Sequence, residues 1–290
     1  MTLSLIVNPH AGGGRAGRLL PEVLATLRAG GLEHGVTLTR DIEHARELAR
    51  AAGAAGSVAV AFGGDGLVGA VAGALRGSSG VLGVLPGGRG NDFARVLGIP
   101  LEPVAACAVL AGGTPTRLDL GQVGTRTFIG IASCGFDSEA NRIANQTRLV
   151  RGNLVYAYGA LRALLGWRPA RFEVTLEDGV SRSFTGYTVA AANSRAYGGG
   201  MLLAPDASLS DGLLDVVIIG AVPKLRFLRL LPTVFRGAHV HRSEVEVVRA
   251  RQVRISADRP FTLYADGDPI GELPVTVSVA PGAVRARVPG

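Results

Sequence analysis

The chain has 290 residues, of which 47% are hydrophobic, and it carries a formal net charge of +7. This composition excludes an intrinsically disordered protein and is long enough for two domains. No apolar run reaches the roughly 18 residues of a membrane span, and residues 1–7 lack the basic start of a signal peptide, so we expect a cytoplasmic protein. Because no nucleic-acid motif accompanies the positive charge, we expect phosphorylated substrates or an anionic membrane surface as partners, and no nucleic acid.

The first predicted strand, residues 3–7, ends in a glycine run that precedes a helical pattern of leucines. Glycines between a strand and a helix leave backbone N–H groups open to an anion, and the helix N-terminus adds partial positive charge. The candidate anion-binding residues here are Asn8, Pro9, Gly12, Gly13 and Gly14, with Arg15 to supply charge. The run lacks the Lys-Ser/Thr ending of a Walker A loop, and a simple connecting turn is the alternative.

A second strand at 36–39 and a helix at 44–52 lead to the central strand, 58–62, which ends in Gly63-Gly64-Asp65-Gly66. This is a second phosphate-loop candidate, in which Asp65 would orient the loop, bind magnesium or position a hydroxyl. The spacing Gly64-x-Gly66-x-x-Gly69 also satisfies the dinucleotide fingerprint. A dehydrogenase needs an acid after the next strand, but strand 81–85 is followed by Pro86 and glycines, so we regard the fingerprint as accidental.

A third glycine-rich loop ends in Gly90-Asn91-Asp92, where Asp92 would either cap a helix at 93–97 or orient a nucleotide. A helix at 101–110 follows, and then the pattern changes to alternating strands and turns. The predicted strands are 116–123, 127–132, 171–176, 183–191, 216–219, 245–248, 252–256 and 261–265. We therefore predict an α/β domain at 1–116 and a β-rich domain at 117–280.

Together, Gly63-Gly64-Asp65-Gly66 and Gly90-Asn91-Asp92-Phe93-Ala94 resemble the diacylglycerol kinase catalytic family. That family includes bacterial soluble lipid kinases and sphingosine kinases and shares its nucleotide fold with NAD kinases. The resemblance implies that residues 1–116 form an α/β nucleotide-binding domain of the NAD-kinase/phosphofructokinase type and that residues 117–280 form a mostly β C-terminal sandwich, the lipid substrate domain. It also implies that the C-terminal segment 281–290, with the last strand at 284–289, returns to the first domain. It also implies ATP and Mg²⁺ as cofactors and a lipid with a primary hydroxyl as substrate.

The resemblance extends to single positions of the nucleotide site. It implies nucleotide contacts from the opening Asn8-Pro9 motif, an approach of Thr39 to the adenosine, and phosphate contacts from the two later loops. The implied set in those loops is Gly63, Gly64, Asp65, Gly66, Leu67, Arg89, Gly90, Asn91 and Asp92. Leu67 and Arg89 depart from the family, which has threonines there; the guanidinium of Arg89 could replace one hydroxyl as a charged phosphate donor.

Three further aspartates in the second half match family positions: Asp119, Asp211 and Asp266. Asp119 matches an aspartate that joins the two domains through a carboxylate, water and metal network; a turn-forming aspartate on an edge strand is the alternative. The stretch around Asp211 resembles a structural magnesium loop, with the Asp211 side chain and the carbonyls of Ser208 and Leu213 as ligands. Asp178-Gly179 carries no such resemblance and predicts a hairpin turn.

Asp266-Gly267-Asp268 matches the family's Asp-Gly-Glu, which supplies the base that activates the attacking hydroxyl. Asp268 is one methylene shorter than the family's glutamate, so we place Asp266 ahead of it as the base. By itself the segment would predict only a hairpin.

Two basic amphipathic stretches could contact an anionic bilayer: a helical insertion at 138–169 and the segment 224–231. The insertion contains Arg142, Arg148, Arg151, Arg162 and Arg168 beside Tyr156, Tyr158 and Trp167. Core-facing helices with snorkelling arginines are the alternative.

The best overall interpretation is an ATP-dependent lipid kinase, peripheral at the inner membrane surface if the bilayer contact exists. An NAD-kinase-like enzyme and a nucleotide- or lipid-binding protein that has lost catalysis are the alternatives, and a homodimer is left open.

Overall fold

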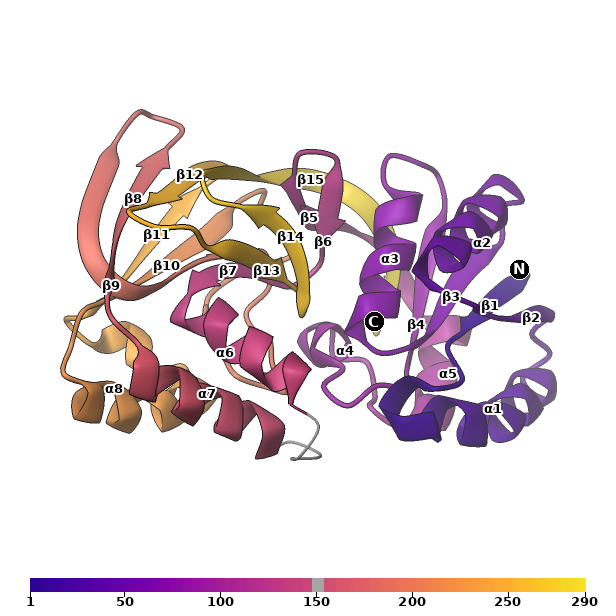
Figure 1. Cartoon of the computed structure of the whole chain (residues 1–290). Coiled ribbons are helices and arrows are strands. Elements are labelled where there is room, and N and C mark those ends of the chain that lie inside the picture. Colours follow the sequence, from indigo (N-terminus) through magenta and orange to yellow (C-terminus); the bar gives the residue numbers. More distant parts are fainter. Residues whose placement is uncertain (148–153) are drawn as a thin grey trace.

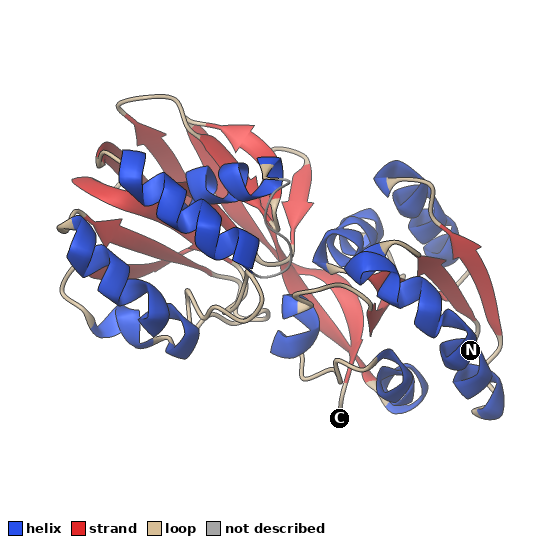
Figure 2. Ribbon diagram, turned by 60° about the horizontal axis from the view of Figure 1, so that its bottom comes forward, coloured by secondary structure: helices blue, strands red, loops and turns tan. Residues whose placement is uncertain are grey.

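The computed structural model describes residues 1–147 and 154–290, and its first half is a parallel sheet between helices. Strands β1 (Leu3–Val7), β2 (His34–Leu38), β3 (Val58–Gly63) and β4 (Val81–Pro86) lie in the order β4-β3-β1-β2. The helices of this half are α1 (Ala11–Ala29), α2 (Ile42–Ala54), α3 (Asp65–Leu75), α4 (Asp92–Val96) and α5 (Pro103–Gly112). Helices α1 and α5 pack together, as do α2 and α3, so both faces of the sheet are covered (Figures 1 and 2). Strand β3 is buried along its whole length, as a central parallel strand must be.

Two long strands carry the sheet into the second half. β15 (Val275–Val288) pairs parallel with β4, antiparallel with β5 (Thr114–Val123), and antiparallel with β12 (Gln252–Ala257). The expected return of the last strand is present, but the strand begins at Val275 rather than at 284. Pro281 and Gly282 shift the register between Ala280 and Val284 without ending the strand, which is why the sequence predicted only its final part.

The second half is a mostly antiparallel β structure with helices against one side (Figure 1). Its remaining strands are β6 (Arg126–Phe128), β7 (Ile131–Gly135), β8 (Ala170–Leu176), β9 (Ser181–Ala192), β10 (Leu214–Gly220), β11 (Val245–Ala250), β13 (Thr262–Ala265) and β14 (Asp268–Glu272). The helices are α6 (Phe136–Gln146), α7 (Leu154–Gly166), α8 (Lys224–Leu230) and the 3₁₀ helices η1 (Leu231–Arg236) and η2 (Ala238–His241). Helices α6, α7 and α8 are held by an aromatic cluster that includes Phe136, Trp167, Tyr187 and Phe227.

One predicted strand, 127–132, is broken in the structure. Ile129 and Gly130 separate β6 from β7, because their N–H groups donate to the carboxylate of Asp266 rather than to a neighbouring strand. The hairpin predicted at Asp178-Gly179 is confirmed: Gly179 has a φ of 83°, and Leu176 donates to the Val180 carbonyl. Arg148 and Arg151 of the predicted membrane contact lie outside the described residues.

Candidate active site

Three glycine loops meet at the carboxyl ends of β1, β3 and β4. A Cβ on Gly12 would lie 2.5 Å from the carbonyl oxygen of Gly87, and one on Gly88 would lie 2.5 Å from the Cα of Gly64. The N–H groups of Gly87 and Gly88 both donate to the Gly63 carbonyl, at 2.7 and 3.1 Å. The three loops therefore touch backbone to backbone, and side chains at these positions would separate them.

The first loop owes its shape to residues 12–14, whose φ angles of 61°, 70° and 85° are left-handed and favour glycine. Asn8 and Pro9, which were also predicted to belong to the site, form hydrogen bonds next to this loop. The Asn8 side chain accepts from the His10 N–H at 3.0 Å, and the Pro9 carbonyl accepts from the Gly17 N–H at 3.3 Å. Thr39, at the end of β2, donates its hydroxyl to the Val7 carbonyl at 3.2 Å. The structure thus brings these residues to the same sheet edge.

Arg15 does not play its predicted part. Its guanidinium donates to the Pro86 carbonyl at 3.2 Å and forms an ion pair with Glu102 at 2.8 Å, so it fastens α1 to the third loop instead of supplying charge for an anion. Sequence analysis missed Arg18, which donates to the Gly13 carbonyl at 3.2 Å. Arg18 lies five residues after Gly13 and binds its backbone carbonyl, so no sequence pattern reveals this contact.

Within the third loop, Asn91 adopts a left-handed conformation, with φ of 52°. Its side chain both accepts from the Gly88 N–H at 2.8 Å and donates to the Gly88 carbonyl at 3.0 Å, which closes the loop on itself. Arg89 is exposed at the tip. The Leu67 side chain is 4% exposed and packs against Gly63 in the core, so the predicted nucleotide contact at this position could come only from its backbone.

Asp65 and Asp92 face a common small space. Asp65 accepts from the Phe93 N–H at 3.0 Å, and Asp92 accepts from the Gly199 N–H at 2.7 Å. A Cβ on Gly90 would lie 3.1 Å from one Asp92 oxygen and 3.3 Å from an Asp65 oxygen. The helix cap predicted for Asp92 is therefore not formed; its carboxylate joins the two halves of the molecule instead.

Two carboxylates stand close together here. Burial raises the pKa of the Asp92 carboxyl, the negative charge of Asp65 raises it further, and the charge of Arg95 offsets only part of this rise. The second oxygen of Asp92 is buried without a hydrogen-bond partner among the described residues. Within 1–147 and 154–290 no three His, Cys, Asp or Glu side chains gather as a metal cage. Magnesium that is shared with phosphates needs only one or two carboxylates, and Asp65 and Asp92 fit that demand.

Asp266 lies in the turn between β13 and β14, with φ of 52°. Its two oxygens accept from the N–H groups of Ile129 at 2.8 Å and Gly130 at 2.9 Å. Burial raises the pKa of Asp266 to about 7, and the charge of Asp65 contributes to the rise. Asp268, by contrast, is exposed at the first position of β14. The two acids of the predicted pair therefore have different environments.

Asp119 is 2% exposed and has direct protein partners. Its carboxylate accepts from the N–H groups of Gly212 at 2.7 Å and Gly282 at 2.6 Å, so backbone amides satisfy both of its oxygens. The edge-strand turn is thus excluded, and Asp119 holds two loops in place, while its predicted part in the active site stays a prediction. Sequence analysis missed Asn193, which is fully buried and donates to the carbonyls of Asp119 and Ile129; a lone amide after three alanines was its only signal.

The predicted magnesium loop lies beside Asp119. Asp211 accepts from the N–H of Leu213 at 3.1 Å, and the Ser208 hydroxyl accepts from the Ser210 N–H at 3.3 Å. A protein cation stands close by: the guanidinium of Arg249 binds Asp215 at 3.2 Å. The hydrogen bond with Asp215 and, to a smaller extent, the negative charge of Asp211 raise the pKa of that guanidinium, so the Asp211 carboxylate belongs to the same group of charges.

Sequence analysis also missed Asp137, an acidic residue near the β13–β14 hairpin that carries Asp266. Asp137, in the first turn of α6, accepts from the hydroxyls of Ser133 and Tyr197. Burial raises the pKa of Asp137 and holds that of Tyr197 well above its ordinary value. Ser133 pairs with Tyr264 across β7 and β13, so this cluster stands next to the hairpin that carries Asp266.

Comparison with known proteins places this geometry in a family. Residues 2–123 match the diacylglycerol kinase catalytic domain, and residues 130–288 match the YegS C-terminal NAD kinase beta sandwich-like domain. A diacylglycerol kinase of Mycobacterium tuberculosis is 36% identical over 295 residues, which cover 99% of this chain and 95% of the relative. The chain belongs to the diacylglycerol kinase family.

Other members of the diacylglycerol kinase family give the same result. A diacylglycerol kinase of Bacillus subtilis is 31% identical, with 93% of this chain and 90% of the relative covered. A diacylglycerol kinase structure from Bacillus anthracis has the same fold, with a TM-score of 0.77, 18% identity, and 99% and 96% of the two chains covered. The predicted family, the two-part fold and the enzyme class, a lipid kinase, are confirmed. As a kinase of this family it uses ATP as phosphate donor.

None of the helices in the described ranges is long and apolar enough to cross a membrane.

Proposed function

We propose that this lipid kinase transfers the γ-phosphoryl group of ATP to the primary hydroxyl of a diacylglycerol-type lipid, between the glycine loops and the Asp266 hairpin. The observation that carries the proposal is the geometry of Asp266, a carboxyl aimed by two backbone N–H donors, and burial raises its pKa to about 7. The charge of Asp65 acts on both Asp266 and Asp92, which links the hairpin to the nucleotide loops.

The phosphates would lie on the backbone N–H groups of the glycine loops. The close contacts of Gly12, Gly64 and Gly88 keep those loops together, so little reorganisation is needed when an anion binds. Arg89, exposed at the loop tip, would add a guanidinium to the bound phosphates. Asp65 and the unpartnered oxygen of Asp92 would hold magnesium, which when bound neutralises charge on the transferred group.

Asp266 would accept the proton of the lipid hydroxyl as that oxygen attacks phosphorus. A base whose pKa lies near the working pH is ionised in a large fraction of molecules and still accepts a proton readily. The N–H groups of Ile129 and Gly130 fix the direction of the carboxylate. Asp268 is exposed and lacks this support, so we assign it at most a secondary role.

The test is transfer of labelled γ-phosphate from ATP and magnesium to a panel of extracted lipids. We compare the wild type with Asp266→Asn and use Asp268→Asn as the matched control. Labelled lipid in the wild type and the control, with loss of about two orders of magnitude or more in Asp266→Asn, supports the assignment. Intact ATP binding without transfer to any lipid would contradict it and favour a nucleotide- or lipid-binding protein that has lost catalysis.

The loop from Ser208 to Leu213 is part of the same proposal, as a structural magnesium site. One Asp211 oxygen already accepts the Leu213 N–H, which leaves its second oxygen and the carbonyls as oxygen ligands. If they bind magnesium, the melting temperature of Asp211→Asn should lose its dependence on magnesium. An equal dependence in the wild type and the variant would remove these ligands.

We also propose transient contact with an anionic membrane, through one face of α7, α8 and η1. The large apolar side chains exposed on these elements are Leu161, Leu165, Leu225, Leu228 and Phe235. Basic residues accompany them, and Lys224 on α8 donates to the Leu165 carbonyl at 2.8 Å, so the helices form one surface (Figure 1). Apolar side chains between basic ones suit the interface of an anionic bilayer at the inner membrane surface.

Vesicle sedimentation tests this membrane face. Leu165→Glu with Leu225→Glu should weaken binding to phosphatidylglycerol vesicles, because both side chains are about 70% exposed and would enter the bilayer. Val180→Glu, in the β8–β9 turn, is the matched control with 46% exposure. Equal binding by all three proteins would refute the assignment.

A homodimer is a further part of the proposal, with β2 as its surface. β2 ends the strand order of the sheet, and Val36 and Leu38 on it are exposed, so it presents an open edge to a second copy. Sedimentation velocity of the wild type and Val36→Lys tests this. A monomer at all concentrations in the wild type would exclude it.

A further inference from the structure

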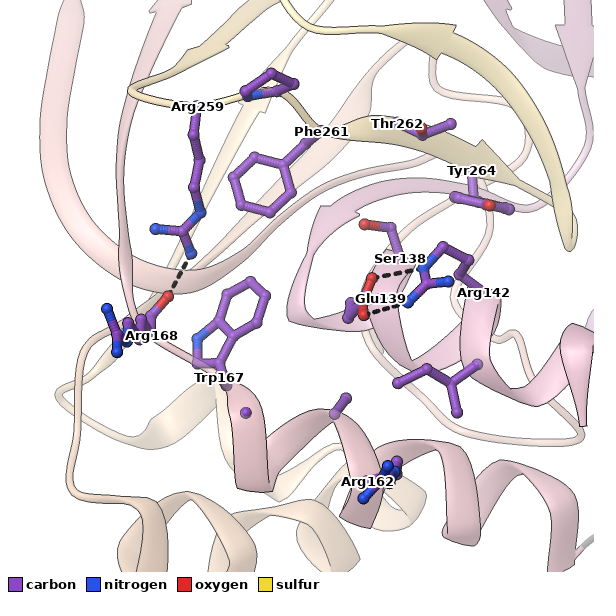
Figure 3. A pocket seen from close by; sticks show the side chains of 14 residues that line it. Ser138, Glu139, Arg142, Arg162, Trp167, Arg168, Arg259, Phe261, Thr262 and Tyr264 are labelled. Atoms are coloured by element: carbon purple, nitrogen blue, oxygen red, sulfur yellow. Dashed lines mark hydrogen bonds and ion pairs between the residues drawn. The ribbon is translucent and has the colours of Figure 1, made fainter.

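A cavity of about 670 Å³ lies between α6, α7 and the segment 259–264 that leads into β13 (Figure 3). It is separate from the glycine loops, and the mechanism proposed above makes no use of it. Ile143, Ala163, Trp167, Pro260 and Phe261 give it an apolar wall, and charged side chains surround that wall.

The charged lining is strongly unbalanced. Four arginines line the cavity against one carboxylate, Glu139. Glu139 is fully engaged by Arg142, with which it forms a bidentate pair at 2.7 and 2.8 Å. Among the described lining residues, no carboxylate is therefore left for Arg162, Arg168 and Arg259. Guanidinium groups that line one cavity suit a phosphate-bearing ligand, because their N–H donors form charge-assisted hydrogen bonds with its oxygens.

The apolar wall is ordered by the same arginines. Trp167 and Phe261 face each other with ring centroids 6.0 Å apart. The guanidinium carbon of Arg259 stands 5.6 Å from the Trp167 ring centroid and 5.1 Å from that of Phe261, and this arginine also donates to the Arg168 carbonyl (Figure 3). One cation is thus held over the aromatic rings, where an anion and a hydrocarbon chain can be bound together.

Trp167 is packed into the wall of the cavity. Its side chain is only 6% exposed, yet its indole N–H has no acceptor among the residues that the structure describes. A buried tryptophan N–H ordinarily has a hydrogen-bond partner, since an unpaired buried donor is costly. Because the indole nitrogen itself is buried, Trp167 offers the cavity its ring and not a hydrogen bond.

We propose that this pocket binds the phosphate-bearing headgroup of an anionic phospholipid, with the first methylenes of the lipid against Trp167 and Phe261. A neutral diacylglycerol offers no anion to Arg162, Arg168 and Arg259, so the occupant is a second lipid and not the phosphoryl acceptor. Its binding retains the enzyme on an anionic membrane.

Trp167 is the sole tryptophan of the chain, so its fluorescence reports on this pocket alone. The full-length protein is titrated, without ATP, with monomeric dihexanoyl phosphatidylglycerol, with dihexanoyl phosphatidylcholine and with inorganic phosphate. We expect a saturable change in emission with the anionic lipid, and none at the same concentrations of the other two. No saturable change, or an equal response to phosphatidylcholine, would overturn the proposal. An equal response to inorganic phosphate would make this a site for the free anion and overturn the lipid assignment.

Variants then locate the anion. Arg162→Gln with Arg168→Gln should weaken binding of the anionic lipid by about tenfold or more, because two charge-assisted contacts are lost. Arg76→Gln with Arg242→Gln changes the net charge equally, at two exposed arginines that do not line the cavity, and should leave the titration unchanged. Equal weakening by both pairs would mean general charge attraction and would refute the site. Because no turnover is measured, the result does not depend on whether phosphate transfer is found.

Discussion

Replacing Asp119 by asparagine tests whether this residue supports the structure or takes part in the chemistry. The substitution keeps the size of the side chain but turns one carboxylate oxygen into an NH₂ group. In the wild type the two oxygens accept from the Gly212 N–H at 2.7 Å and the Gly282 N–H at 2.6 Å. One of these donors must then face another donor, in a site where Asp119 is only 2% exposed.

The expected loss follows from these two contacts. A hydrogen bond to a charged group contributes about 1.5–3 kcal/mol, and a buried donor left unpaired costs about 1–3 kcal/mol. We therefore expect Asp119→Asn to lower the free energy of unfolding by about 3 kcal/mol or more. At roughly 2 °C for each kcal/mol in a chain of this size, the melting temperature should fall by about 6 °C.

Scanning calorimetry measures this change, with Asp178→Asn as control. Asp178 also accepts a backbone N–H, from Val180 at 2.9 Å, but it lies in an exposed turn and its variant should melt within about 1 °C of the wild type. If Asp119→Asn melts like the wild type and only turnover falls, our reasoning is refuted and Asp119 acts in the chemistry.

Three further predictions concern the reaction. Gly88→Ala places a Cβ 2.5 Å from the Gly64 Cα, so ATP affinity by calorimetry should fall by about tenfold or more while the protein stays folded; unchanged affinity would contradict the cradle. Because the pKa of Asp266 is about 7 and its ionised form is the base, kcat/KM should rise with pH up to about 7. Besides burial, the charge of Asp65 contributes to that raised pKa, so Asp65→Asn should move the rise in kcat/KM to lower pH. A pH profile that is flat from pH 5 to 8 would exclude this base. Gly130→Ala places a Cβ 2.5 Å from an Asp266 oxygen, so transfer should fall by about tenfold or more with ATP affinity retained, and normal transfer would show that the carboxylate direction is unimportant.

Much of the nucleotide half was predictable because its signals are local. A glycine run directly after a buried strand predicts a strand, a loop and a helix start, whatever the rest of the chain does. The loops after β1, β3 and β4 follow this rule, and parallel strands place their carboxyl ends at one edge of the sheet. The strand positions of the second half also followed from their alternation, as in β8.

The partners of the acids were not predictable, because they depend on segments distant in sequence. Asp92 binds Gly199, and Asp266 binds Ile129 and Gly130, all more than 100 residues away. These contacts also explain one error, the unbroken strand at 127–132, and they explain why Asp92 does not form the helix cap that was one of its two alternatives. Arg15 failed for the same reason: the sequence shows a cation near a glycine loop, but Glu102 is 87 residues further on.

Three buried or half-buried carboxylates near the junction of the two halves differ in what satisfies them, and the difference orders their roles. Asp119 has an N–H donor on each oxygen, so it needs no ligand and acts as a fixed support. Asp92 has a donor on one oxygen and no partner among the described residues on the other, and it lies near Asp65, so it is the carboxylate that suits the cation we propose. Asp266 has its donors but is buried near the same negative charge, so it is the group that binds a proton near neutral pH. If a cation at Asp65 and Asp92 offsets that charge, the pKa of Asp266 falls, and binding of the cation and ionisation of the base are favoured together.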